Sequence, residues 1–290
     1  ANGQLTGTPV SVSANTTSTF TITATDNENQ TNTRQFNLIV LRPVYVTQIS
    51  NSCMFDGSGS RLQRTQEAAS TTYTWSGWLK KSGRFNDYEI FWCSGNDIAV
   101  GFWGSISTSD IYVHSGGSNY RTGYMTRDVS SWYHVVFQNN AGTFTIWVNG
   151  YQIYQNSIGR ALSTTAQATR IGHYYSNGSG AYYFDGYMSD IHFIDGQAKS
   201  PTDFATEYND VWTPIAYTGT YGTGGYRLEF TTANNAGRDT SGTTPYNNFG
   251  VGGIDFAHLV KDSPTINMAT QNSLGIRRDE LTVPTYYRGN

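Results

Sequence analysis

Charged residues are scarce in this sequence. Asp, Glu, Lys and Arg together make up 13% of 290 residues, and the formal net charge is −3. Proteins that bind nucleic acid or acidic membranes rely on clustered Lys and Arg side chains. A weakly charged and slightly acidic chain offers no such surface. We therefore expect neither nucleic acid nor a membrane among its partners.

The sequence also lacks long hydrophobic runs and has only two cysteines. No apolar run reaches the roughly 18 residues that a membrane-spanning helix needs. The first ten residues lack the basic and apolar regions of a signal peptide. Cys53 and Cys93 cannot make a disulfide framework between them. We interpret them as two buried thiols, with a single bridge as the alternative.

Residues that carry hydrolytic chemistry are few as well. No G-x-S-x-G nucleophile motif occurs, and the histidines lack zinc-binding spacing, so His134 and His192 are expected to be satisfied within strands. A β-sandwich glycosidase needs two carboxylates at a fixed separation. The nearest pattern is Asp87-Tyr88-Glu89, which places both acids on one face of a strand. We interpret it as a solvated strand edge, and the sequence predicts that the chain is not an enzyme.

Tyr, Thr, Phe, Val and Gly are abundant instead, a composition typical of many short strands joined by tight turns. Polar and apolar residues alternate over 19–25 and 34–40, on either side of the turn signal at 26–29. This pattern predicts a hairpin, which is only marginally stable alone. We expect residues 1–43 to be an incomplete domain whose apolar side chains contact a partner chain or a further segment. Those side chains are Phe20, Ile22, Phe36 and Leu38.

Residues 44–212 contain a series of short predicted strands with turn signals between them, which favours a sandwich or barrel. The strands are 73–79, 132–137, 144–148 and 187–194. Asn149-Gly150 between apolar runs predicts a hairpin turn. Residues 200–204 predict a capped turn of helix after the last strand.

Three resemblances can be added to these patterns. Gly7-Thr8-Pro9 with the strands at 19–25 and 34–40 resembles the C-terminal part of bacterial and phage Ig-like domains. The motifs CMFDG (53–57), YTWSGWLKKS (73–82), WYHVVFQNNAGTFTIWVNGYQI (132–153) and FDGYMSDIHFIDGQAKSPTDF (184–204) occur in the order of a laminin-G-like, concanavalin-type domain. This second resemblance implies an all-β fold: a two-sheet jelly-roll sandwich over 44–212, with the partial Ig-like segment before it.

The third resemblance concerns residues 213–290, which we expect to form an irregular, β-rich extension. YTGTYGTGGYRLEF (217–230), DTSG (239–242) and DSPT (262–265) resemble the tail of structural proteins from marine tailed bacteriophages. Thr243-Thr244 and 266–268 depart from that pattern. Tyr226, Leu228 and Phe230 alternate as one apolar face, which needs a cover. We expect this extension to dock on the sandwich or on a neighbouring protomer.

Two segments rich in Tyr, Ser, Gly and Asn are the candidate ligand-binding loops. Antibody paratopes use this composition, because Tyr offers large contact area and the small polar residues adapt their hydrogen bonds. The candidates are Tyr174, Tyr175, Asn177, Tyr182 and Tyr183 in the loop 173–183, and Asn119 and Tyr120 in the loop 116–124. The alternative is that these tyrosines pack on the rim of the sandwich.

Calcium is the one cofactor that we consider, because sandwiches of the resembled type often hold it in loops with carboxylate and amide oxygens. The candidate ligands are Asn96, Asp97, Asp110 and Asp185. Asp and Asn are also common turn residues, so the alternative is that these positions only form turns.

The resemblances together imply a virion appendage of a tailed phage, such as a tail fibre or head fibre, on the surface of the extracellular particle. It would bind a host-surface glycan or protein and assemble as a homo-oligomer with other virion proteins. A purely structural decoration protein, a bacterial surface adhesin and a glycan hydrolase are the alternatives.

Overall fold

The computed structural model describes residues 16–40, 47–65, 69–82, 88–95, 98–104, 110–162, 168–176, 179–231 and 235–265. The chain forms two compact units, Ala1–Val46 and Thr47–Asn290. No described helix is long and apolar enough to span a membrane. Cys53 and Cys93 are both buried and free, which confirms the prediction of two buried thiols.

The described part of the first unit is one antiparallel hairpin of β1 (Thr16–Thr25) and β2 (Thr31–Val40). Phe20 lies opposite Phe36, and their rings stack with centroids 5.7 Å apart. Ile22 and Leu38 are exposed on the same face. The hairpin and its turn are confirmed, and its apolar face is not covered by the described residues of its own unit. The resemblance to an Ig-like domain stays a prediction.

We expect the exposed apolar face of this hairpin to promote self-association, because burying it removes apolar surface from water. Ile22→Thr should weaken association in sedimentation velocity. Ile39→Thr is the matched control, since Ile39 lies on the opposite, threonine-rich face with 60% exposure against 53% for Ile22. Equal association of the two variants would contradict the expectation.

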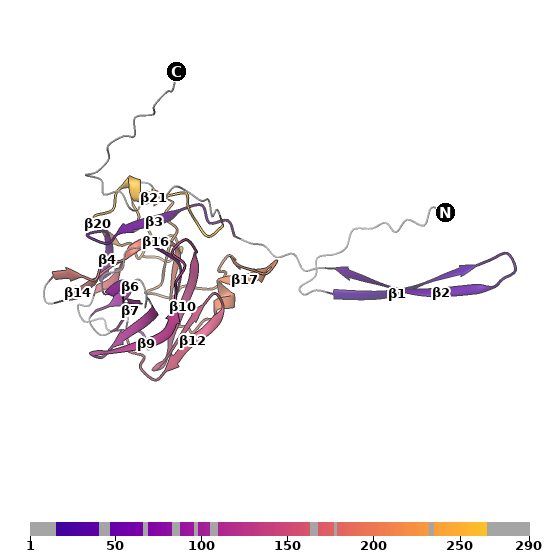
Figure 1. Ribbon diagram of the computed structural model, residues 1–290, viewed down its shortest axis with the longest axis horizontal. Helices are drawn as coiled ribbons and strands as arrows, with labels where there is room; N and C mark the ends of the chain where they lie inside the picture. Colours follow the sequence, from indigo (N-terminus) through magenta and orange to yellow (C-terminus); the bar gives the residue numbers. More distant parts are fainter. Residues whose placement is uncertain are drawn as a thin grey trace, which may run out of the picture. The chain divides into compact units, whose positions relative to one another are not determined.

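The second unit is a sandwich of two antiparallel sheets (Figure 1). The eight-stranded sheet has the order β12-β11-β10-β5-β16-β3-β21, with β19 also paired to β16. Its strands are β3 (Ser52–Asp56), β5 (Thr72–Lys81), β10 (Tyr133–Asn140), β11 (Thr143–Val148), β12 (Tyr151–Asn156), β16 (Asp185–Asp195), β19 (Tyr226–Leu228) and β21 (Leu259–Val260).

The seven-stranded sheet has the order β20-β4-β13-β6-β7-β8-β9. Its strands are β4 (Arg61–Thr65), β6 (Tyr88–Ser94), β7 (Ile98–Trp103), β8 (Asp110–Ser115), β9 (Ser118–Met125), β13 (Ala168–Ile171) and β20 (Gly250–Gly252). In Figure 1, β6, β7 and β9 lie in one layer and β10 and β12 in the other. The all-β concanavalin-like sandwich predicted from the sequence is confirmed.

A core rich in aromatic side chains fills the space between the sheets. Trp75 on β5 stacks on Phe137 of β10 with centroids 5.2 Å apart, and Trp92 of β6 contacts Phe137 from the opposite sheet at 5.1 Å. All three are fully buried. Apolar burial of this kind, about 25 cal/mol for each Å², is the main stabilising contribution to such a fold.

Several local predictions are confirmed and one is wrong. The strands at 73–79, 144–148 and 187–194 lie within β5, β11 and β16, and Asn149-Gly150 makes the predicted hairpin turn with positive φ at both residues. Ser200 and Asp203 cap a 3-10 turn, η1 (Pro201–Asp203). Residues 116–124 are not a loop. Only Gly116-Gly117 turns the chain, and β9 follows at once, because its backbone pairs with β8.

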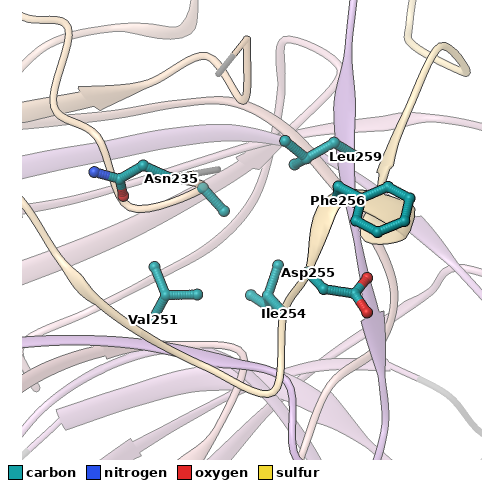
Figure 2. A pocket seen from close by; sticks show the side chains of 7 residues that line it. Asn235, Val251, Ile254, Asp255, Phe256 and Leu259 are labelled. Atoms are coloured by element: carbon teal, nitrogen blue, oxygen red, sulfur yellow. The ribbon is translucent and has the colours of Figure 1, made fainter. Parts of the chain in front are cut away.

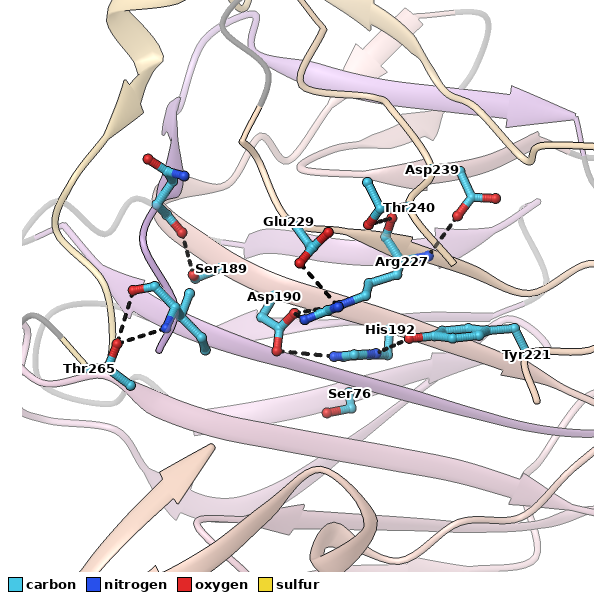
Figure 3. Close-up of polar contacts among 12 residues, drawn as sticks. Ser76, Ser189, Asp190, His192, Tyr221, Arg227, Glu229, Asp239, Thr240 and Thr265 are labelled. Atoms are coloured by element: carbon cyan, nitrogen blue, oxygen red, sulfur yellow. Dashed lines mark hydrogen bonds and ion pairs between the residues drawn. The ribbon is translucent and has the colours of Figure 1, made fainter. Parts of the chain in front are cut away.

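The described part of the segment after residue 212 docks on the sandwich, as predicted. Tyr226, Leu228 and Phe230 are buried in the core, and β19 pairs with β16. A buried polar cluster stabilises this contact, as Figure 3 shows. Asp190 accepts bonds from His192 and Arg227, and His192 contacts the hydroxyl of Tyr221 at 2.8 Å. β20 and β21 add the same segment to the edges of both sheets.

Candidate functional site

The outer face of the eight-stranded sheet is covered by the chain itself. Phe204, Tyr217 and Tyr221 pack over His192 of β16, and Trp212 donates its Nε1–H to Nδ1 of His134 on β10. The other nitrogen of His134 bonds the Ser76 hydroxyl. Burial lowers the pKa of His134 to about 3, so the ring is neutral. Both histidines therefore have protein partners and are covered by neighbouring side chains.

The outer face of the seven-stranded sheet is covered mainly by one short hairpin of β14 (Tyr174–Ser176) and β15 (Ser179–Ala181). Cross-strand partners share a face, so the pairing assigns each side chain. On the outer face, Cys93, Ala99 and His114 form one row of cross-strand partners. Gly101 and Tyr112 form the next row. The alternate residues on the same strands belong to the core.

An aromatic cluster forms on this outer face, and we name it the outer aromatic cluster: Tyr88, Trp103, Tyr112, Tyr174 and Tyr182. Tyr88 lies edge-on to Trp103, with centroids 4.5 Å apart, and edge-on to Tyr182 at 5.3 Å. Tyr112 is buried at its base, whereas Trp103 is partly exposed. Such edge-to-face packing fixes the ring orientations without closing the cluster to solvent.

The segment after β15 adds Tyr182 to the cluster in a strained conformation. Tyr182 has φ of +53°, an uncommon value for a bulky residue that costs on the order of 1–3 kcal/mol. Its carbonyl accepts a bond from the Ile90 backbone N–H, 2.9 Å away, and Tyr183 forms a parallel β-bridge with Ile90, so this segment runs alongside β6. The tyrosine side chain remains 43% exposed. Strain of this kind concentrates at ligand-binding sites.

The structure brings together most of the sequence-predicted tyrosines, and it places each differently. Tyr174 packs against His114, and Tyr175, 38% exposed, lies over the guanidinium of Arg170. Tyr183 stacks on His173 at 5.7 Å and is half-buried. Tyr174 and Tyr182 therefore belong to the outer aromatic cluster, Tyr175 lies beside Arg170, and Tyr183 supports the base of the hairpin. Asn177 lies outside the described residues.

The other predicted pair is divided between the two faces of the sheet. Asn119 is exposed on the outer face and bonds Nδ1 of His114 at 2.8 Å. Tyr120 pairs with the core residue Val113 and so lies on the core side. Two consecutive residues of a strand cannot share a face. Only Asn119 belongs with the aromatic cluster.

The calcium candidates are separated in the structure. Asp110 is fully buried, and both of its oxygens accept bonds from Arg121, with a further bond from the Gly123 backbone. Asp185 lies at the start of β16, opposite Asp56 on β3. The described residues contain no group of three or more acidic, His or Cys side chains that could hold a metal. Asn96 and Asp97 lie outside the described residues, so a calcium ion there stays a prediction.

The interpretation of Glu89 as part of a solvated strand edge is wrong. Glu89 pairs with Phe102 on the core side of the sheet and is only 5% exposed. Burial and, to a smaller extent, the nearby carboxylate of Asp185 raise its pKa to about 9, against the opposing effects of the Asp185 backbone N–H and Lys81. Tyr88, between the two acids of the motif, is the residue on the outer face. Asp87 lies outside the described residues.

A separate cavity of about 220 Å³ lies beside β20 and the 3-10 turn η2 (Phe256–His258), as Figure 2 shows. Its lining is mostly apolar: Ala236, Val251, Ile254, Phe256 and Leu259, with Asn235 and Asp255. Asp255 uses its carboxylate to cap η2 through the Ala257 backbone and His258. The carboxylate in this cavity is therefore already bonded within the η2 turn. The outer aromatic cluster is the better candidate site.

Comparison with protein families agrees with this architecture. The sequence profile described as the concanavalin A-like lectin/glucanases superfamily matches residues 56–205. The chain belongs to this superfamily. The match ends at the first residue of β17 (Ala205–Tyr208), which pairs with β18 (Val211–Pro214), and it includes all described strands of the outer aromatic cluster. No curated protein matches the sequence.

Solved structures with similarity to this chain come from several sources. A Bacteroides ovatus protein, provisionally described as carbohydrate-binding, has 15% identity and a TM-score of 0.53, with 83% of this chain and 68% of that chain covered. A heptameric pentraxin of Limulus polyphemus has 17% identity and a TM-score of 0.44, over 52% and 78%. Tailspike protein 2 of bacteriophage CBA120 has 12% identity and a TM-score of 0.38, over 67% and 30%. At such identities only the Bacteroides ovatus structure, with a TM-score above 0.5, indicates a similar fold, and it indicates the fold alone.

The cluster residues that sequence reasoning missed are Tyr88, Trp103 and Tyr112. One signal was available: residues 111–114 alternate, so Tyr112 and His114 had to share a face opposite Ile111 and Val113. The sequence contains no comparable pattern that predicts the packing of the β14–β15 hairpin on this face, because that packing depends on contacts between residues far apart in the chain.

Proposed function

We propose that this superfamily member is a non-enzymatic carbohydrate-binding protein, and that the outer aromatic cluster is its binding surface. The observation that carries the proposal is a cluster of aromatic side chains, four of them partly exposed, on the outer face of the seven-stranded sheet. Tyr and Trp rings present flat apolar faces with a polar edge, which suits the apolar faces and hydroxyl rims of sugar rings. Asn119 and the half-buried His114 add adaptable polar groups beside them.

The arrangement of carboxylates supports binding rather than hydrolysis. A glycosidase places two carboxyl groups roughly 5–9.5 Å apart around the scissile bond. On the described part of the outer face, Asp110 is the acidic side chain closest to the cluster, and Arg121 engages both of its oxygens. Glu89 belongs to the opposite side of the sheet. The described face therefore holds no acid and nucleophile pair.

The biological setting that we propose is a virion appendage of a tailed phage, such as a tail fibre or head fibre, which attaches the particle to a host-surface glycan. The support is the sequence resemblance of 217–265 to structural proteins of marine phages, together with a lectin-like fold. We further propose that the protein assembles as a homo-oligomer with other virion proteins, since the β1–β2 face is apolar and exposed. A decoration protein without a host ligand and a bacterial adhesin are the alternatives.

The test of binding is the substitution Tyr182→Ala, which removes an exposed ring from the cluster. We expect glycan binding on an array, and adsorption to host cells, to weaken by about 1–3 kcal/mol, or roughly 5- to 150-fold. Surface substitutions usually change stability by about 0.5 kcal/mol or less, so thermal melting should stay close to wild type.

The matched control is Tyr208→Ala on β17, because Tyr208 is 44% exposed against 43% for Tyr182 and lies outside the cluster. This variant should bind as the wild type does. Unchanged binding by Tyr182→Ala, together with a lower melting temperature, would favour the purely structural alternative.

A further inference from the structure

The outer face also holds a buried guanidinium that the aromatic cluster does not explain. Arg170 on β13 pairs with Cys93 of β6, in the row that continues to Ala99 and His114. Arg170 is 8% exposed, and its guanidinium carbon lies 5.0 Å from the ring centroid of Tyr175. The cation is therefore at the outer face, directly beside a partly exposed tyrosine.

Arg170 has no carboxylate partner within the part of the chain that the structure describes. Its Nη1 donates a long bond of 3.4 Å to the Ala168 carbonyl, and its guanidinium lies within hydrogen-bonding reach of the Cys93 thiol. Its buried Nε–H has no acceptor among the described residues. The neighbouring thiol of Cys93 is neutral, because burial raises its pKa to about 12 although Arg170 opposes this. A buried charge without a counter-ion lowers stability. Natural proteins retain such costs chiefly at functional sites.

The remaining charges on this face leave the cation of Arg170 uncompensated. Arg121 and Asp110 neutralise each other in a bidentate ion pair. The guanidinium of Arg160 lies against Gly116 at the turn between β8 and β9, so it adds positive charge at the rim. The described face thus carries excess positive charge next to its aromatic surface, although the chain as a whole has a net charge of −3.

We propose that the saccharide bound on this face carries a carboxylate, and that the guanidinium of Arg170 recognises this group beside the ring of Tyr175. This inference rests on the proposed carbohydrate binding and specifies its ligand class as an acidic sugar. The aromatic rings contribute stacking that is independent of charge, and Arg170 contributes the preference for an acid. A guanidinium is suited to the task, because its planar fork matches a carboxylate and it is always charged.

The experiment compares oligosaccharides of galacturonic, glucuronic and sialic acid with their methyl esters, which keep the sugar ring and remove the charge. We expect the wild type to bind at least one acid ten-fold or more tightly than its ester at low ionic strength. Added salt should reduce this preference, since it screens the attraction. Arg170→Gln should abolish the preference and leave binding of the ester unchanged, and Arg170→Lys should retain part of it.

Lys261→Gln is the control for loss of one positive charge, because Lys261 is exposed and pairs with Asn51 away from this face. It should keep the full preference. Melting curves establish that Arg170→Gln is folded, and the acid and ester pairs test the wild type without any variant. Equal binding of acid and ester by the wild type would overturn the acidic ligand and leave carbohydrate binding intact. If the wild type bound neither the acid nor the ester of any pair, both proposals would be overturned.

Discussion

Asp190→Asn should lower the free energy of unfolding by about 3–5 kcal/mol at neutral pH, the usual cost of breaking a buried ion pair from one side. Asp190 is 4% exposed, and it bonds Nε and Nη2 of Arg227, both at 2.9 Å, and Nε2 of His192 at 3.1 Å (Figure 3). Asparagine keeps the shape and tolerates the positive φ of 44° at this position. The substitution therefore removes charge and leaves the backbone in place.

The pH dependence follows from the direction of the pKa shift. Burial alone raises the pKa of Asp190, but His192 and Arg227 outweigh it and hold the pKa below its usual value of 3.8. The stabilisation is thus complete above about pH 4 and is lost as the pH falls through the lowered pKa. Wild type and variant should differ fully at pH 7, and the difference should shrink in acid.

Chemical denaturation at pH 7 and at about pH 3 measures both quantities. Glu229→Gln is the matched control, because Glu229 bonds the same Arg227 at 3.1 Å but its side chain is 32% exposed. Its loss should cost less than about 1 kcal/mol. If Asp190→Asn lowered the free energy of unfolding as little as Glu229→Gln does, the cluster would not stabilise the docking of β19 on the sandwich.

The contrast between Asp190 and the core strands shows how far sequence reasoning extends. β5, β10, β11 and β16 follow from alternation and from turn residues such as Asn149-Gly150, because local backbone preference and core packing agree there. Asp190 lies at a bulge within β16, where the pairing with β5 shifts register. Its role depends on Arg227, which is 37 residues further along the chain. No local pattern encodes that contact.

The candidate site, too, could be predicted from the sequence only in part. Composition alone pointed to the segment 173–183, since its Tyr, Ser, Gly and Asn residues are those of adaptable binding loops. The structure adds Tyr88 and Trp103 from strands far away in the sequence. The segment 116–124 has similar composition, yet it forms β9 because β8 offers an unpaired edge. Composition identifies what a segment can bind, whereas strand pairing decides which side chains reach the surface.

Glu89→Gln should stabilise the protein, and the gain should increase with pH. Glu89 is buried, one of its oxygens has no hydrogen-bond partner among the described residues, and burial raises its pKa from 4.5 to about 9. Between these two values the folded state keeps a proton that the unfolded chain releases. Stability from this group is therefore complete below about pH 4.5 and is lost as the pH rises, by up to about 1.4 kcal/mol per pH unit.

Glutamine has nearly the same shape as the protonated acid and does not titrate, so the variant escapes this loss. From pH 5 to pH 7.5 its advantage over the wild type should grow by up to about 3 kcal/mol, or roughly 6–12 °C in melting temperature. This window lies below the titration of the neighbouring Lys81, whose pKa burial lowers to about 8, against the opposing effect of Glu89. Glu207→Gln, an exposed carboxylate on β17, is the control and should change little at either pH. If Glu89→Gln were instead destabilising at pH 7.5, Glu89 would have to be ionised and paired with Lys81, and the core side of β6 would hold an ion pair in place of a neutral acid.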